Sequence, residues 1–433
     1  MPAARGYNLV VKARVVRRLL WLAGFACLWL NFFDDPPLRT GAYVQNVTSS
    51  EATVAKITAY PAQVVCTVRD ASGAVIKTVR GPAARRRHAL RIEGLQPATD
   101  YAYELAEVGG DIQQGRLRTA PIADQAPVKF AFLGDSGEQP WWVWLQRKPA
   151  MHWPARWGWF ATSSAVTEIG AAVAAYAPDF AIHVGDLVYP WGWHAHYASG
   201  FFRPFAALMR NAPFYAVLGN HDVIDLNGLQ MLSNLILPKG ELTGDSRCYS
   251  FAWGAVRVIA LDFNPDAEGR VRPEHPACEF LRAELGRCTE PWIVVASHYP
   301  MWSASRQRNF GDLLESVAPV IEEHAVSLYL CGHDHCYQHF EGSAGGRDTV
   351  PMIVSGGGGK DLYEVRPHSM AVELKSQYHW CSVEVQGASL TLRAIAIDGG
   401  LIDTLRLNLP EGDRLERIRR LNPGRAARIE RLR

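Results

Sequence analysis

The chain has 433 residues, of which 48% are hydrophobic and 20% are charged, a composition typical of globular proteins and a length sufficient for two or three domains. Its formal net charge of +2 excludes an overall positive field that would select a nucleic acid as partner. Eight cysteines are too few for a fold built on disulfides at this size.

The N-terminus has the pattern of a targeting segment. Five Lys and Arg residues precede an apolar run from Leu19 to Phe33, the order that is typical of an export signal. The run is short for a membrane-spanning helix of about 20 residues, and Pro36 and Pro37 separate it from the rest of the chain. We therefore expect residues 1–36 to be a cleaved signal or an anchor through residues 19–33, with the remainder periplasmic, secreted or membrane-anchored outside the cytoplasm. A buried core helix is the alternative.

Residues 38–121 are predicted to form an all-β domain. Runs such as 53–58 and 64–68 alternate or are continuously apolar, and Gly, Pro and Asp separate them. The stretch 94–103 resembles the loop and following strand of fibronectin type III modules, and 116–119 resembles their last strand. A sandwich of this kind carries no chemistry of its own.

From residue 127 to residue 408, short apolar runs typical of buried strands alternate with helical patterns, which predicts a layered α/β or α+β domain. The runs assigned to strands are 128–133, 180–184, 214–218, 256–261, 292–296 and 326–330. The tail, residues 409–433, is rich in arginine, and we expect it to be solvated surface.

All but one of these runs are followed by residues that can bind a metal. The motifs are G-D-S-G with Asp135, G-D-L-V-Y with Asp186 and Tyr189, G-N-H-D with Asn220 and His221, A-S-H with His298, and G-H-D-H with His333 and His335. Loops at the carboxyl ends of strands converge on one crevice in layered folds, and glycine lets the chain turn sharply there. A single Gly-Asp or strand-end His is weak evidence, but the whole series predicts one metal site.

These motifs, in this order, resemble those of the purple acid phosphatases, a branch of the calcineurin-like metallophosphoesterases. The resemblance covers about two thirds of the chain. It implies a layered calcineurin-like fold, a β-sandwich flanked by helices, which here follows the fibronectin type III-like sandwich.

The resemblance also implies two metal ions. The ligands of a ferric ion would be Asp135, Tyr189 and His335. Those of a divalent ion (iron, zinc or manganese) would be Asn220, His298 and His333. Asp186 would bridge both ions. Phenolate and carboxylate are hard anions that suit a trivalent ion, whereas imidazoles and an amide oxygen suit a softer divalent one.

The implied activity is hydrolysis of a phosphate monoester, as in acid phosphatases, by attack of a metal-bound hydroxide. His221 would bind the phosphate or protonate the leaving group, and Asp222 would orient His221. Family members often carry another histidine where this chain has Arg306 and Arg308, which could bind phosphate but cannot readily donate a proton. The partner is therefore expected to be a small phosphoester. A phosphodiesterase and a non-catalytic cell-surface binding protein remain alternatives.

Three further features leave alternatives open. Cys278 and Cys288 could pair in an oxidising compartment, whereas Cys331 and Cys336 fit small buried side chains better than zinc ligands. The tryptophan-rich stretch 141–159 could be a lid, a membrane-surface patch or plain packing. The glycine-rich stretch 355–360 lacks the spacing of a nucleotide-binding loop and is interpreted as a turn near the metal site.

Overall fold

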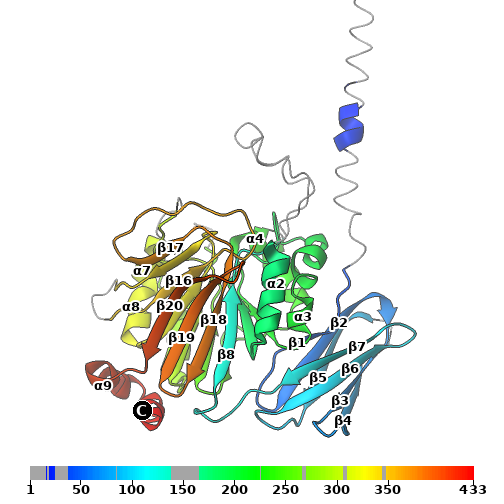
Figure 1. The fold of residues 1–433 in the computed structure, drawn as a ribbon, viewed down its shortest axis with the longest axis horizontal. Coiled ribbons are helices and arrows are strands. Elements are labelled where there is room, and N and C mark those ends of the chain that lie inside the picture. Colours follow the sequence, from blue (N-terminus) through cyan, green and yellow to red (C-terminus); the bar gives the residue numbers. More distant parts are fainter. Residues whose placement is uncertain are drawn as a thin grey trace, which may run out of the picture.

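Two β-rich domains lie side by side in the computed structural model (Figure 1). The residues that the structure describes are 16, 19–24, 38–83, 85–137, 165–224, 226–265, 270–305, 310–343 and 348–433. Most of the leader, the tryptophan-rich stretch 141–159, Arg306 and Arg308 lie outside the described residues. Within the described part, no helix has the length and apolar character needed to cross a membrane.

The N-terminal domain is a sandwich of two antiparallel sheets, with strand orders β1-β2-β5 and β4-β3-β6-β7. Its strands are β1 (Tyr43–Gln45), β2 (Glu51–Ala62), β3 (Val64–Arg69), β4 (Val75–Arg80), β5 (Arg85–Glu93), β6 (Asp100–Glu107) and β7 (Ile112–Arg118). Val64, Cys66 and Val68 of β3 are buried at every second position, the period of a strand with one face on a core. The prediction of an all-β domain is thus confirmed, while its fibronectin type III character stays a prediction.

The second domain contains two larger sheets, ordered β10-β9-β8-β18-β19-β20 and β11-β12-β13-β14-β16-β15-β17. The strands of the first sheet are β8 (Val128–Leu133), β9 (Phe180–His183), β10 (Phe214–Ala216), β18 (His379–Gln386), β19 (Ser389–Ala396) and β20 (Leu401–Asn408). Those of the second are β11 (Tyr249–Trp253), β12 (Val256–Ala260), β13 (Trp292–Ala296), β14 (Leu328–Cys331), β15 (Tyr337–Phe340), β16 (Met352–Ser355) and β17 (Ala371–Lys375).

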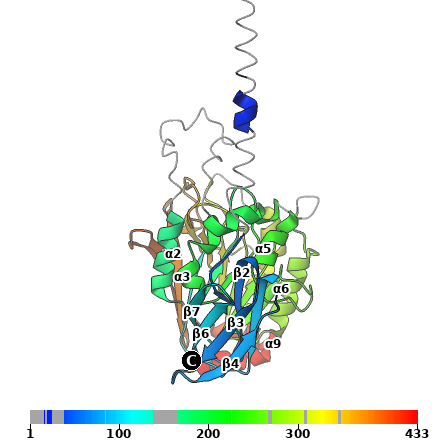
Figure 2. The same ribbon diagram turned by 90° about the vertical axis from the view of Figure 1, so that its right-hand side faces the viewer.

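Parallel strands form one half of the first sheet and the centre of the second. β8, β9 and β10 run parallel in the first, and β12, β13, β14 and β16 do so in the second. Helices cover both outer sides (Figure 2). They include α2 (Ala165–Tyr176), α3 (Ala206–Met209), α4 (Asn220–Ile224), α5 (Leu229–Asn234), α6 (Pro276–Arg287), α7 (Gly311–Ser316) and α8 (Ala318–Glu323). The layered fold with a helical cover is the one that the sequence predicts.

The two domains share one hydrophobic core, which runs from the sandwich into the first large sheet. Polar contacts reinforce this junction. The hydroxyl of Tyr43 donates to the carbonyl of Asn234 at 2.9 Å, and that of Tyr215 donates to the carbonyl of Val47 at 3.2 Å. Buried hydrogen bonds between the domains hold them in one fixed arrangement.

The basic tail packs one face against the second domain, so the prediction that it is solvated surface holds for its exposed arginines and is wrong for Arg425. It forms α9 (Gly412–Leu421) and α10 (Pro423–Leu432). The side chain of Arg425 is only 2% exposed, and its guanidinium donates to the carbonyls of Pro291, His324 and Ala325. Burial lowers the pKa of Arg425 to about 10, so the residue is still charged at neutral pH. These three hydrogen bonds to backbone carbonyls explain why a charged side chain is tolerated inside.

Replacing Arg425 by methionine should lower the free energy of unfolding by about 3 kcal/mol, because the change leaves buried carbonyls without donors. A urea titration followed by tryptophan fluorescence measures this loss. Arg420→Met, at an exposed position of α9, is the matched control and should change stability by less than about 0.5 kcal/mol. Equal effects of the two substitutions would contradict the structural role of Arg425.

The suggested Cys278–Cys288 disulfide is absent, and both thiols are free and buried. Cys278 lies in the first turn of α6 and Cys288 caps its end. A rise of about 1.5 Å per residue separates them by about 15 Å, far beyond the reach of a disulfide. Cys331 and Cys336 are also free and buried, and burial raises the pKa of both thiols well above its ordinary value.

Candidate metal centre

Five loops that follow the strands β8, β9, β10, β13 and β14 converge at one end of the two large sheets. Each predicted donor comes within three residues of a strand end except Tyr189, Asn220 and His335, which lie slightly further along their loops. The structure thus brings all seven predicted donors together: Asp135, Asp186, Tyr189, Asn220, His298, His333 and His335. They come from positions that are up to 200 residues apart in the chain, since 335 − 135 = 200.

Three of the donors lie on tight turns. Asp135, Asp186 and His333 have φ angles of 54°, 57° and 69°, in the left-handed region that non-glycine residues rarely adopt. Such conformations persist where the surrounding structure fixes them, and they are common at functional sites.

The glycines of the motifs allow the loops to approach the carboxylates. A Cβ atom on Gly219 would lie 2.2 Å from Oδ1 of Asp186, and one on Gly332 would lie 2.4 Å from Oδ2 of Asp135. Both distances are far shorter than a van der Waals contact, so a side chain at either position would displace the carboxylate. The glycines before Asn220 and His333 have this steric cause.

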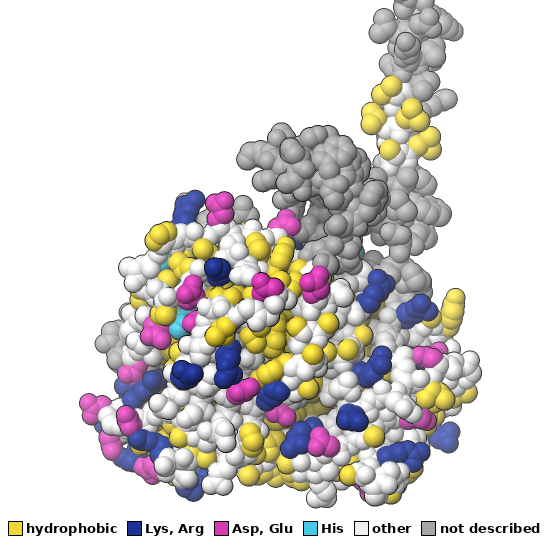
Figure 3. Space-filling model, viewed as in Figure 1, with side chains coloured by type: hydrophobic (Ala, Val, Ile, Leu, Met, Phe, Trp, Pro, Cys, Tyr) yellow, Lys and Arg dark blue, Asp and Glu magenta, His cyan; other side chains and the backbone are white. Residues whose placement is uncertain are grey.

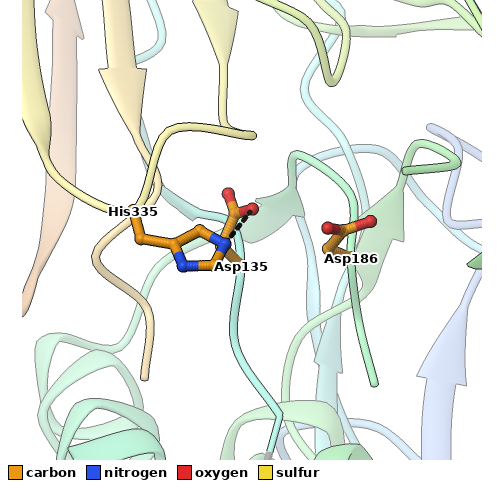
Figure 4. Close-up of side chains that lie close together, drawn as sticks. All are labelled: Asp135, Asp186 and His335. Atoms are coloured by element: carbon orange, nitrogen blue, oxygen red, sulfur yellow. Dashed lines mark ion pairs between the residues drawn. The ribbon is translucent and has the colours of Figure 1, made fainter. Parts of the chain in front are cut away.

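The first group of donors is almost entirely buried. The phenol oxygen of Tyr189 lies 3.2 Å from Oδ1 of Asp135, 3.0 Å from Oδ2 of Asp186 and 3.2 Å from Nε2 of His335. One ligand atom from each of Asp135, Asp186 and His335 lies within 4.8 Å of the others (Figure 4). Carboxylate, phenol and imidazole groups around one point are suitable ligands for a hard cation.

The second group lies beside the first and is more open to solvent. Oδ1 of Asn220 is 3.0 Å from Nε2 of His298 and 2.9 Å from Nδ1 of His333. Nε2 of His298 also lies 3.5 Å from Oδ1 of Asp186. Asp186 therefore directs one oxygen toward each group. Asn220 and His333 are only partly buried, whereas Asp135 and Tyr189 are 0% exposed, so a substrate would approach from the side of the second group.

Hydrogen bonds to backbone carbonyls orient two of the histidines. Nδ1 of His298 donates to the carbonyl of Val184 at 2.9 Å, and Nδ1 of His335 donates to that of Asp361 at 2.8 Å. A carbonyl only accepts, so each Nδ1 carries the proton and each Nε2 keeps a free lone pair toward the centre. This arrangement is typical of histidines that bind metals.

The electrostatics of the site fit a bound cation. Burial, together with the charge of Asp186, raises the pKa of Asp135 well above its ordinary value. Burial lowers the pKa of His333 to about 3 and that of His335 well below its ordinary value, so these imidazoles are neutral at physiological pH. Neutral imidazoles do not compensate two buried carboxylates, whereas metal ions would.

His221 faces the centre from the solvent side. Its Nδ1 donates to the carbonyl of Pro190 at 2.6 Å, and its Nε2 lies 4.0 Å from Oδ2 of Asp186. We expected Asp222 to orient His221, but the carbonyl of Pro190 has this role. Both oxygens of Asp222 instead accept backbone N–H groups, from Asp186 at 2.8 Å, Leu187 at 3.1 Å and Gly219 at 2.9 Å. Asp222 thus fixes the loop that carries Asp186.

The sequence analysis missed Asp334, which lies between the two histidines of the last motif. Its side chain points away from the metal centre and accepts the hydroxyls of Ser303 at 2.5 Å and Ser305 at 2.8 Å, and the amide of Gln338 at 2.8 Å. No local signal in the sequence marks this role, because two of the donors, Ser303 and Ser305, lie 31 and 29 residues earlier in the chain.

The glycine-rich stretch 355–360 lies directly against the first motif, as predicted. Gly358 donates to the carbonyl of Gly134 at 3.0 Å, and the backbone N–H of Lys360 donates to the carbonyl of Asp135 at 3.0 Å. Nζ of Lys360 is 4.6 Å from the centre of the Tyr189 ring. This segment therefore supports Asp135 and covers Tyr189.

This chain is similar to known proteins. The model of the calcineurin-like phosphoesterase family matches residues 128–337. Tartrate-resistant acid phosphatase type 5 of Mus musculus is 25% identical over 213 residues, which are 44% of this chain and 64% of that protein. Purple acid phosphatase 7 of Arabidopsis thaliana is 27% identical over 226 residues, 47% of this chain and 67% of that protein.

A solved structure shares the fold over a longer range. Purple acid phosphatase PPD1 from yellow lupin (Lupinus luteus) seeds superposes with a TM-score of 0.69 at 15% identity, and the match covers 86% of this chain and 75% of that one. The match to the mouse protein, in contrast, spans less than two thirds of its length. The long structural match therefore supports the fold of the whole described chain. The sequence matches support the family resemblance of the second domain.

Proposed function

Residues 128–337 form a calcineurin-like phosphoesterase domain, and from this premise we propose that the chain hydrolyses phosphate monoesters at a two-metal centre. The observation that carries the proposal is the position of Asp186, one oxygen of which faces Tyr189 while the other faces His298. A carboxylate that faces two groups of donors can hold two cations a short distance apart. The relatives described above are named acid phosphatases, and a pair of cations is suited to the hydrolysis of a phosphate ester.

The predicted site residues would have three roles: binding of a first metal ion, binding of a second metal ion, and contact with the substrate. Asp135, Tyr189 and His335 would hold a ferric ion, and Asn220, His298 and His333 a divalent ion of iron, zinc or manganese. Two bound cations supply positive charge to the phosphoryl oxygens and lower the pKa of water, which provides the nucleophile. His221, on the open side, would bind the phosphate or give a proton to the leaving group.

Substrate profiling tests the reaction. The purified protein with its metals should hydrolyse p-nitrophenyl phosphate with a higher kcat/KM than bis(p-nitrophenyl) phosphate. A preference for the diester would replace the proposal by a phosphodiesterase, and the absence of both activities in a metal-loaded protein would favour a binding protein.

Replacing Tyr189 by phenylalanine tests the ferric site, because phenolate-to-iron charge transfer requires the hydroxyl that lies between Asp135 and Asp186. We expect the native protein to absorb visible light and Tyr189→Phe to lose this band. Tyr299→Phe is the matched control, since this tyrosine packs beside His298 and bonds Asn264 but does not contact the first group. A colourless, iron-free and active native protein would leave only a general two-metal phosphoesterase.

We also propose that the chain acts outside the cytoplasm, because its basic and then apolar N-terminus has the order of an export signal. Fractionation of the cells that produce it, with hydrolysis assayed in each fraction, measures the location. Activity confined to the cytoplasm would contradict export, and mass spectrometry of the mature N-terminus would show whether residues 1–36 are removed.

A further inference from the structure

A cavity of about 800 Å³ lies between the N-terminal sandwich and the phosphoesterase domain. On one side it is lined by residues 39–41, 56–59 and 107–113 of the sandwich, and on the other by residues between 198 and 210. None of the predicted metal ligands lines it. Because the two domains share a core, both walls are held in place without a ligand. Cavities at domain junctions are common positions for ligand sites.

The charge of this junction cavity is positive. Four cationic side chains line it, Arg39, Lys56, Arg203 and Arg210, against two anionic ones, Glu107 and Asp111. Both carboxylates are ion-paired to Lys56, whose Nζ lies 3.0 Å from Oε2 of Glu107. Four cationic and two anionic side chains leave the lining of the cavity with a net charge of +2.

Arg39 and Arg203 are exposed and Arg210 is half-buried. None of the three makes a side-chain hydrogen bond or ion pair within the described part of the chain, whereas Lys56 of the same cavity pairs with both carboxylates. Arg210 is the most constrained of them. Its carbonyl accepts the hydroxyl of Tyr103 at 2.8 Å, which fixes the residue at the domain junction. Its Nε is buried and has no hydrogen-bond partner. Because this Nε is not exposed to solvent, the terminal nitrogens of Arg210 are the donors that an oxyanion in the cavity would reach. A Cβ atom on Gly41, which lines the cavity, would lie 3.9 Å from Nη2 of Arg210.

The rest of the lining is apolar and includes Ile57 and Phe202. Cationic groups beside an apolar wall select a ligand that has an anionic head and an apolar body. Guanidinium groups form paired hydrogen bonds with carboxylates and phosphates alike, but a phosphate has more oxygens and so accommodates several guanidinium groups at once. Figure 3 shows Lys and Arg side chains on the sandwich as well as over the rest of this face.

We propose that the junction cavity is a second binding site, distinct from the metal centre, for an organic phosphate. Arg39, Arg203 and Arg210 bind the phosphate, and its organic part packs against Ile57 and Phe202. The phosphate group belongs either to a small free molecule or to the headgroup of a lipid, and the same guanidinium groups recognise both.

Isothermal titration with phenylphosphonate tests the site, because its carbon–phosphorus bond resists hydrolysis. The metal-loaded protein should bind two molecules, one at the metal centre and one in the junction cavity. Arg210→Gln should weaken only the second binding event, by about 10- to 100-fold, and leave hydrolysis of p-nitrophenyl phosphate unchanged. Arg203→Gln, at an exposed position with little risk to folding, should have an effect of the same kind. Arg393→Gln removes an exposed arginine of β19 and should leave both events intact.

A second arm identifies the source of the phosphate. If the ligand is a lipid headgroup, vesicles of phosphatidylcholine with phosphatidic acid should bind the native protein more strongly than they bind Arg210→Gln. If phenylphosphonate binding depends on Arg210 but vesicle binding does not, the ligand is a small free molecule. Absence of Arg210 dependence in both arms would overturn the proposal. Because the cavity and the metal centre share no residue, failure of the proposed hydrolysis would leave this test valid.

Discussion

Asp186→Asn is expected to lower kcat/KM for phosphate monoesters by about 10³-fold or more and to reduce the metal content of the purified protein. Its Oδ2 lies 3.0 Å from the phenol oxygen of Tyr189, and its Oδ1 lies 3.5 Å from Nε2 of His298. An amide has one oxygen and no charge, so it cannot serve both groups of donors. Its oxygen can still accept the N–H of His221, as Oδ1 now does at 2.8 Å, so the loop should fold normally.

Metal analysis of the purified variant and steady-state kinetics measure the two effects. Asp403→Asn is the matched control, because Asp403 also accepts buried side-chain donors, the hydroxyl of Tyr337 at 2.7 Å and Nδ1 of His339 at 2.8 Å. It contacts no predicted ligand and should keep both the metals and the activity. Full metal content and full activity in Asp186→Asn would refute the two-metal interpretation of the centre.

The convergence of the seven donors was predictable because they lie in loops that follow strand ends, and because a glycine directly precedes four of them: Asp135, Asp186, Asn220 and His333. This local pattern persists in the sequence even though the fold must bring the donors together from distant positions. Asp334 and its partners Ser303, Ser305 and Gln338 carry no such pattern. The hydrogen bonds between them form because the loop after β13 packs against the turn after β14, and no local signal in the sequence encodes this packing.

The strand order shows the same limit. The sequence indicated where strands lie, but not that β18 pairs with β8 across about 250 residues, with Cys381 opposite Phe132. Pairings between distant strands depend on the whole core rather than on local propensity. Arg425 was misassigned for a related reason, because its charge predicts exposure unless the three carbonyls that accept from it are known.

His221→Ala should retain the metals of the centre but lower kcat by about 10²- to 10⁴-fold, the range expected for loss of an acid–base group. The side chain is 31% exposed and lies on the open side of the site, and its Nε2 is 4.0 Å from Asp186. Nδ1 is bound to the carbonyl of Pro190, so only Nε2 is free to act on a substrate.

The dependence on the leaving group separates the two roles proposed for His221. If His221 protonates the leaving group, His221→Ala should impair an alkyl phosphate much more than p-nitrophenyl phosphate, whose leaving group needs no proton. If His221 only binds the phosphate, both substrates should lose activity equally. His368→Ala, outside the centre, is the control and should leave both rates unchanged. Unchanged kcat in His221→Ala for both substrates would exclude both roles for His221.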